Sequence, residues 1–81
     1  LIGKGAKVDL AKHDGGTPLF VACQKGHEST ARLLLGKGAT VDLAMNDGAT
    51  SLGIACQQGH ESTARLLLDN GASVNNMNNS G

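Results

Sequence analysis

The sequence predicts an all-α repeat solenoid, and three observations carry this prediction. Shifting the 81-residue chain by 33 positions aligns residues 12–44 with residues 45–77 at 20 identical positions. Within that alignment the block Gly26–Leu35 recurs without change. The apolar side chains are spaced for short amphipathic helices, and 11 Leu and 10 Ala supply most of them, beside a single Phe. Self-similarity at this period is typical of one supersecondary unit stacked on copies of itself.

The repeat divides the chain into four segments. Residues 1–11 match residues 34–44 at nine of eleven positions, so they form the end of a truncated repeat. Residues 12–44 and 45–77 are full repeats, and residues 78–81 start a further one. We therefore expect the chain to be an excerpt of a longer array. A structure of this kind needs little core of its own, because each repeat covers its neighbour.

The first helix of each repeat is predicted from its start signal. Thr17 is a suitable N-cap, and Pro18 follows at the first helical position, where its missing N–H costs nothing. Leu19, Ala22 and Cys23 then fall at the i, i+3 and i+4 positions of one helix face. The pattern predicts a short helix with one buried side.

The second helix is predicted over residues 28–35. Gly26 ends the helix before it, since glycine readily adopts the left-handed conformation found after helices. Gly38 ends the second helix in the same way. Glu28 and Arg32 form an i, i+4 pair that repeats in the next copy. Neither helix is long enough to be stable alone, so stacking is required.

The segments between helix pairs contain tight turns. Asp14-Gly15 and Asp47-Gly48 place a short acceptor side chain before a glycine, the usual composition of such turns. We expect each turn to join an outgoing and an incoming extended segment.

A period of 33 residues with this composition resembles the ankyrin repeat. The matching residues in the first full repeat are Gly15, Thr17-Pro18-Leu19, Ala22, Gly26-His27, Leu33-Leu34-Leu35, Gly38-Ala39 and Val41-Asp42. Those in the second are Gly48, Thr50, Leu52, Ala55, Gly59-His60, Leu66-Leu67-Leu68, Gly71-Ala72 and Val74-Asn75. The resemblance covers nearly the whole chain. It implies L-shaped units, with helix pairs stacked in a row and β-hairpin or turn fingers projecting at one side.

The chain departs from the family pattern at three positions. The family usually has His after Thr-Pro-Leu, where this chain has Phe20 in one repeat and Gly53 in the other. Ser51 also replaces the proline. A glycine inside a short helix costs about 1 kcal/mol relative to alanine, so we expect the first helix of the second repeat to be the softer one. Phe20 could compensate by covering the space beside Gly53.

The Cys and His residues repeat in register with the fold. Cys23 and His27 lie four apart, as do Cys56 and His60, which is in principle a zinc ligand set. Stacked helices lie about 8–10 Å apart, too far for both pairs to reach one ion or for the cysteines to form a disulfide. The resemblance implies instead that each Cys is a small core residue and each His anchors the turn between helices. We expect no metal or cofactor, and two reduced, buried thiols typical of the cytoplasm or nucleus.

Other chemistries find little support in the sequence. The net charge is zero, without the basic field that a nucleic acid or an anionic membrane would require, although residues 1–40 carry about +3 and residues 41–81 about −3. No apolar run approaches the length of a membrane span. Ser29, Ser62 and the neighbouring Thr residues are expected on exposed helix flanks with no base beside them, so we predict no catalytic residues.

The remaining function is binding to another protein. In the ankyrin family, partners are usually held by the finger tips and the exposed ends of the first helices. Carried onto this chain, the candidate partner-binding residues are His13, Asp14, Gly16, Gln24 and Lys25 in one repeat and Asn46, Asp47, Ala49, Gln57 and Gln58 in the next. The alternative is a structural spacer whose partners bind elsewhere in a longer scaffold. Uncovered repeat faces at the two ends would also favour weak head-to-tail self-association.

Overall fold

The computed structural model describes residues 8–74, which contain four helices and no β-strand. The helices are α1 (Pro18–Gln24), α2 (Glu28–Gly36), α3 (Ser51–Gln57) and α4 (Glu61–Asp69). Most of the predicted truncated repeat and the predicted start of a further repeat lie outside the described residues.

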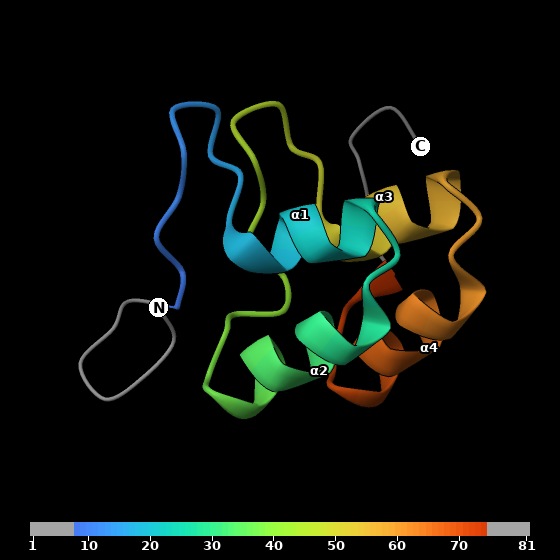
Figure 1. Ribbon diagram of the computed structural model, residues 1–81. Helices are drawn as coiled ribbons and strands as arrows, with labels where there is room; N and C mark the ends of the chain where they lie inside the picture. Colours follow the sequence, from blue (N-terminus) through green and yellow to red (C-terminus); the bar gives the residue numbers. More distant parts are fainter. Residues whose placement is uncertain (1–7, 75–81) are drawn as a thin grey trace.

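The helices form two stacked pairs (Figure 1). Within each repeat the two helices pack on each other, and across the repeats α1 packs on α3 while α2 packs on α4. The segments that precede α1 and α3 rise side by side at one edge of the stack as two fingers. The all-α repeat solenoid predicted from the sequence is thereby confirmed. The fingers are turns, because the described residues contain no strand.

The predicted start and stop signals operate as expected. Thr17 and Thr50 are N-caps, and their hydroxyls accept hydrogen bonds from the backbone N–H groups of Phe20 at 3.2 Å and Gly53 at 3.1 Å. Just after α1, Gly26 has φ +72°, a conformation that residues with a Cβ rarely adopt. Local caps therefore fix the ends of helices that are too short to persist alone.

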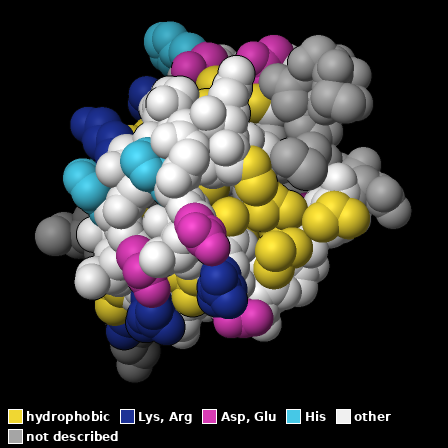
Figure 2. Space-filling view, turned by 90° about the vertical axis from the view of Figure 1, so that its right-hand side faces the viewer, with side chains coloured by type: hydrophobic (Ala, Val, Ile, Leu, Met, Phe, Trp, Pro, Cys, Tyr) yellow, Lys and Arg dark blue, Asp and Glu magenta, His cyan; other side chains and the backbone are white. Residues whose placement is uncertain are grey.

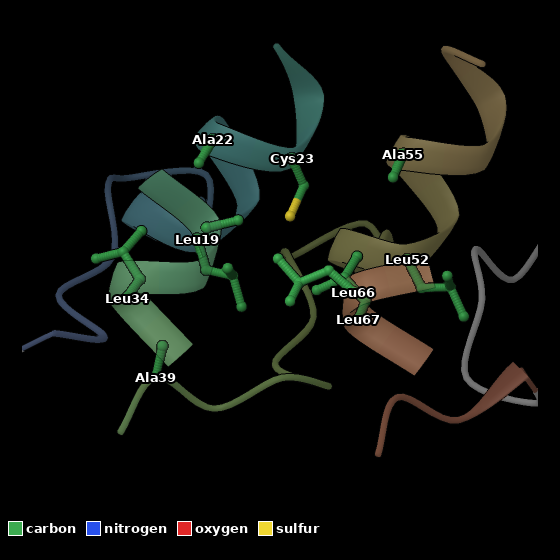
Figure 3. Packing of buried hydrophobic residues seen from close by; sticks show 10 residues of the cluster. Leu19, Ala22, Cys23, Leu34, Ala39, Leu52, Ala55, Leu66 and Leu67 are labelled. Atoms are coloured by element: carbon green, nitrogen blue, oxygen red, sulfur yellow. The ribbon is translucent and has the colours of Figure 1, made fainter. Parts of the chain in front are cut away.

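The core is a small aliphatic cluster spanning both repeats (Figure 3). Leu19, Leu52 and Leu67 are fully buried, as is Cys23. Cys23 and Leu66 point into the space between the two helix pairs. The core is thus largely an interface between repeats, as expected for stacked units.

Two identical positions have different environments, which corrects one expectation. Thr30 is exposed, but Thr63, its counterpart 33 residues later, is only 2 % exposed. The prediction that both lie on exposed flanks is wrong for Thr63, because α2 packs against this side of α4. Ser29 and Ser62 are both exposed, as expected.

Aspartate side chains also connect segments one repeat apart. The Asp9 carboxylate accepts hydrogen bonds from the N–H and hydroxyl of Thr40, at 3.0 and 2.6 Å. Asp42 accepts the corresponding bond from the N–H of Ser73 at 3.0 Å. These contacts join segments 31 residues apart and repeat with the period of the fold.

The predicted i, i+4 ion pairs are present on the outer surfaces of α2 and α4. Arg32 lies 2.6 Å from Glu28, and Arg65 lies 3.2 Å from Glu61. Both pairs are solvent-exposed, so each contributes at most a few tenths of a kcal/mol.

Candidate protein-binding surface

The first finger is a tight turn built by its own backbone. The N–H of Lys12 donates to the carbonyl of Gly16 at 2.8 Å, and the N–H of Gly15 donates to the carbonyl of Lys12 at 2.9 Å. The Asp14 carboxylate accepts the N–H of Gly16 at 2.9 Å. Gly15 has φ +88°, which accounts for the glycine predicted at this turn.

The second finger repeats this geometry and is bonded to the first. Met45 and Ala49 close it with a 2.8 Å backbone bond, and Asp47 accepts the N–H of Ala49 at 2.9 Å. Asn46 then reaches across. Its backbone N–H donates to the carbonyl of Asp14 at 3.0 Å, and its side-chain amide donates to the carbonyl of His13 at 3.0 Å. The two fingers therefore form one continuous edge.

The structure brings most of the predicted binding residues to this edge. His13, Asp14, Asn46 and Asp47 are exposed at the finger tips. The exposed residues at the ends of the first helices are Gln24, Lys25, Gln57 and Gln58. Gly16 and Ala49 are buried at the bases of the fingers, where their N–H groups bind Asp14 and Asp47, so neither offers a side chain to a partner.

Three of the finger residues also stabilise the fingers themselves. Asp14 and Asp47 bind backbone within their own turns, and Asn46 joins the two turns. In contrast, the side chains of Lys25 and Gln58 make no hydrogen bond to the other described residues. The side chains of Lys25 and Gln58 can therefore contact a partner without breaking a bond within the described residues.

A groove beside this edge contains residues that sequence reasoning missed. It has a volume of about 390 Å³ and runs along α1 from Leu10 past Val21, with Lys12 and Lys25 among its lining residues. Leu10 is 68 % exposed, although it is a large apolar side chain. Its pairing with Lys12 and Val21 depends on how the segment before α1 folds back, so spacing alone gives no signal for it.

The His residues of the two repeats play different parts. The ring nitrogen Nε2 of His60 lies 3.1 Å from the backbone carbonyl of Gln24, the last residue of α1 in the preceding repeat. The anchor implied by the resemblance thus acts between repeats. His27, at the equivalent position, is exposed and makes no side-chain cap bond.

The two thiols also differ, which corrects a second expectation. Cys23 is fully buried, and burial raises the pKa of its thiol to about 11, partly offset by a hydrogen bond with the Ser51 side chain. Cys56 is exposed, so the prediction of two buried thiols is wrong for it. The reason is that α3 packs on the side of α1 that carries Cys23, whereas no helix among residues 8–74 packs on the side of α3 that carries Cys56. Both cysteines are free.

Within residues 8–74, no group of three or more His, Cys, Asp or Glu side chains comes together as a metal site. None of the described helices is long and apolar enough to cross a membrane.

A comparison with curated proteins found no match. The family model of ankyrin repeats in three copies matches residues 1–78. Ankyrin repeats are generally protein–protein interaction modules, and the family is typically non-catalytic. With the stacked helix pairs, the paired fingers and a match over almost its whole length, the chain belongs to the ankyrin-repeat family.

Proposed function

We propose that this chain binds another protein through the finger edge and the adjoining ends of α1 and α3. The observation that carries the proposal is the bonding of the second finger to the first by Asn46, which holds exposed polar side chains from both repeats in one row. Such a preformed edge loses little conformational entropy when a partner binds.

The two repeats differ where the proposed surface lies. His13 corresponds to Asn46, and Lys25 corresponds to Gln58, within repeats that are otherwise largely identical. Different side chains on a common scaffold are what a specific binding surface requires. The exposed Lys25 gives the first repeat a positive charge that the second lacks at this position.

The proposal includes a cellular compartment. The unpaired Cys23 and Cys56 support a reducing compartment, the cytoplasm or nucleus.

The test is a pull-down with a variant that leaves the turns intact. Substituting His13, Lys25, Gln57 and Gln58 together by alanine removes exposed side chains that cap no turn. We expect partners identified by mass spectrometry to be lost with this variant. A matched variant with Ser29 and Ser62 replaced by alanine changes exposed positions on α2 and α4 and should retain them. If the first variant keeps every partner, binding does not use the finger edge and the proposal is wrong. If the unaltered chain captures no partner, the chain is a structural spacer.

A further inference from the structure

The two repeats are near copies, so residues buried between them have exposed counterparts at one end. Leu66 of α4 is 7 % exposed, whereas Leu33, its counterpart in α2, is 55 % exposed. Thr63 and Thr30 differ in the same direction. In each pair the residue type is the same, and what differs is whether another described helix packs against it. We call the surface formed by His27, Thr30 and Leu33 the leading face.

The opposite end shows the complementary difference. Cys23 is fully buried against the second repeat, but its counterpart Cys56 is exposed. Leu35 is half-buried, but its counterpart Leu68 is 45 % exposed. Figure 2 views the molecule from the α3–α4 end, where hydrophobic side chains gather on the surface. We call the surface formed by Cys56, Gln57, Gly59 and Leu68 the trailing face.

The internal interface shows how a leading face fits a trailing face. The ring of His60 lies against Gly26, so close that a Cβ built on Gly26 would lie 2.7 Å from its Nδ1. The same ring reaches the carbonyl of Gln24. Because Gly26 has no side chain, the His60 ring fits against its backbone, and the Gln24 carbonyl lies within hydrogen-bonding distance of that ring.

The residues of this contact have counterparts on the leading and trailing faces of the described residues. The leading face carries His27 in place of His60, and the trailing face carries Gln57 and Gly59 in place of Gln24 and Gly26. Among residues 8–74, no neighbouring atom lies within 4 Å of a Cβ built on Gly59, so there is space for a ring beside it. The groove of about 390 Å³ continues the leading face, since His27 and Thr30 also line it.

One difference weakens the fit. Ser51, which bonds Cys23 at the internal interface, is replaced by Pro18 at the leading face, so Cys56 would lose a hydroxyl partner. The net charges of the two halves partly offset this loss, because residues 1–40 carry about +3 and residues 41–81 about −3, which favours a head-to-tail orientation.

We propose that the chain associates head to tail with a second copy of itself, the leading face of one seating on the trailing face of the next in the register of the internal interface. The contact joins two different surfaces, so each added copy leaves a further pair of faces free and the product is an open stack. The two proposed surfaces share Gln57 and the groove residue Lys25, but Leu33 and Leu68 lie on α2 and α4, outside the proposed partner-binding surface. Variants at these two leucines therefore test self-association separately from the proposed function.

The test is sedimentation velocity of the full 81-residue chain over a wide concentration range. We expect the average sedimentation coefficient to rise with concentration. Leu33→Asp disables only the leading face and Leu68→Asp only the trailing face, so each variant alone should remain a monomer. Circular dichroism verifies that both stay folded. Ser29→Asp adds the same charge at a position exposed in both repeats and should associate like the unaltered chain.

Mixing the two disabled variants gives the deciding result. The Leu33→Asp chain retains its trailing face and the Leu68→Asp chain its leading face, so an equimolar mixture should form dimers and nothing larger. General hydrophobic aggregation would not restore dimers in this way. The proposal is overturned if the unaltered chain stays monomeric, if either variant alone still associates, or if the mixture remains monomeric.

Discussion

At the scale of single residues, Gly26 and Gly59 separate two reasons for needing glycine. Both have positive φ, +72° and +75°, but only Gly26 has the His60 ring against its α-carbon. Because His60 is also bonded to Gln24, its ring cannot move aside without losing that contact. The pair therefore isolates packing between repeats from backbone conformation.

We predict that Gly26→Ala destabilises the fold more than Gly59→Ala. Gly59→Ala should cost about 1–2 kcal/mol for the left-handed conformation alone. Gly26→Ala should cost at least about 1 kcal/mol more, since the added methyl overpacks the contact with His60. Urea unfolding measures both. Equal losses would show that the His60 contact contributes nothing to the stability of the stack.

Cys23 makes the stability depend on alkaline pH. The pKa of the folded thiol is raised from 9.0 to about 11, chiefly by burial. As pH rises through 9.0 the unfolded chain releases this proton first, while the folded chain holds it until about pH 11. Ionisation therefore favours the unfolded state, and the stabilising effect is present below pH 9.0 and lost by about pH 11.

We predict that the free energy of unfolding falls by an extra 1–2 kcal/mol, roughly, over this range because of Cys23. Other groups titrate there too, so the measure is the difference in pH dependence between the unaltered chain and Cys23→Ala. Cys56→Ala is the matched control and should keep the full dependence, since Cys56 is exposed. Identical pH profiles for the unaltered chain and Cys23→Ala would contradict the assignment.

At the scale of elements, helix ends could be predicted from sequence, whereas the surroundings of each helix could not. Thr17, Thr50 and Gly26 act on neighbouring backbone groups, so the residues near each helix end are enough to predict it. Thr30 and Thr63 lie in identical ten-residue blocks, yet one is exposed and the other buried. No sequence rule can separate them, because the difference comes from the neighbouring repeat.

Phe20 is the position in α1 at which the chain departs from the family pattern. It is 6 % exposed and lies outside the main cluster of buried apolar residues. Gly53, its counterpart in α3, is also buried. That Phe20 covers the space beside Gly53 stays a prediction.

We predict that Phe20→Ala destabilises the protein by about 3–5 kcal/mol, as expected for a buried aromatic side chain. Val21→Ala, at the next and half-buried position, is the control and should cost less. A double-mutant cycle with Gly53→Ala tests the contact itself, because residues in contact show non-additive effects. A loss of under about 0.5 kcal/mol for Phe20→Ala would show that the ring contributes little to the stability of the fold.

At the scale of the whole molecule, the sequence predicts each finger of the candidate site, but not how the two fingers are joined. The turns at Asp14 and Asp47 were predictable, since each is closed within five residues, 12–16 and 45–49. The bridge from Asn46 to His13 was not, because it depends on the spacing between stacked helix pairs. The proposed binding edge is therefore a product of stacking as much as of its own residues.

Stacking also determines whether one repeat can fold without the other. The core is shared between repeats, and each repeat alone has only two short helices of 7 and 9 residues. Such helices are marginal in water without a covered apolar face. The repeats should consequently unfold as one cooperative unit.

We predict that Leu66→Asp unfolds both repeats together. It places a charge between α2 and α4 at a site that is 7 % exposed, and an unpaired buried charge is far costlier than the loss of a methyl group. Leu33→Asp makes the same change at the equivalent position of the first repeat, which is 55 % exposed, and should leave the helical signal intact. Far-ultraviolet circular dichroism compares the two variants. If Leu66→Asp retained half of the helical signal, one repeat would be folding independently, and the stability of this chain would be local to each repeat.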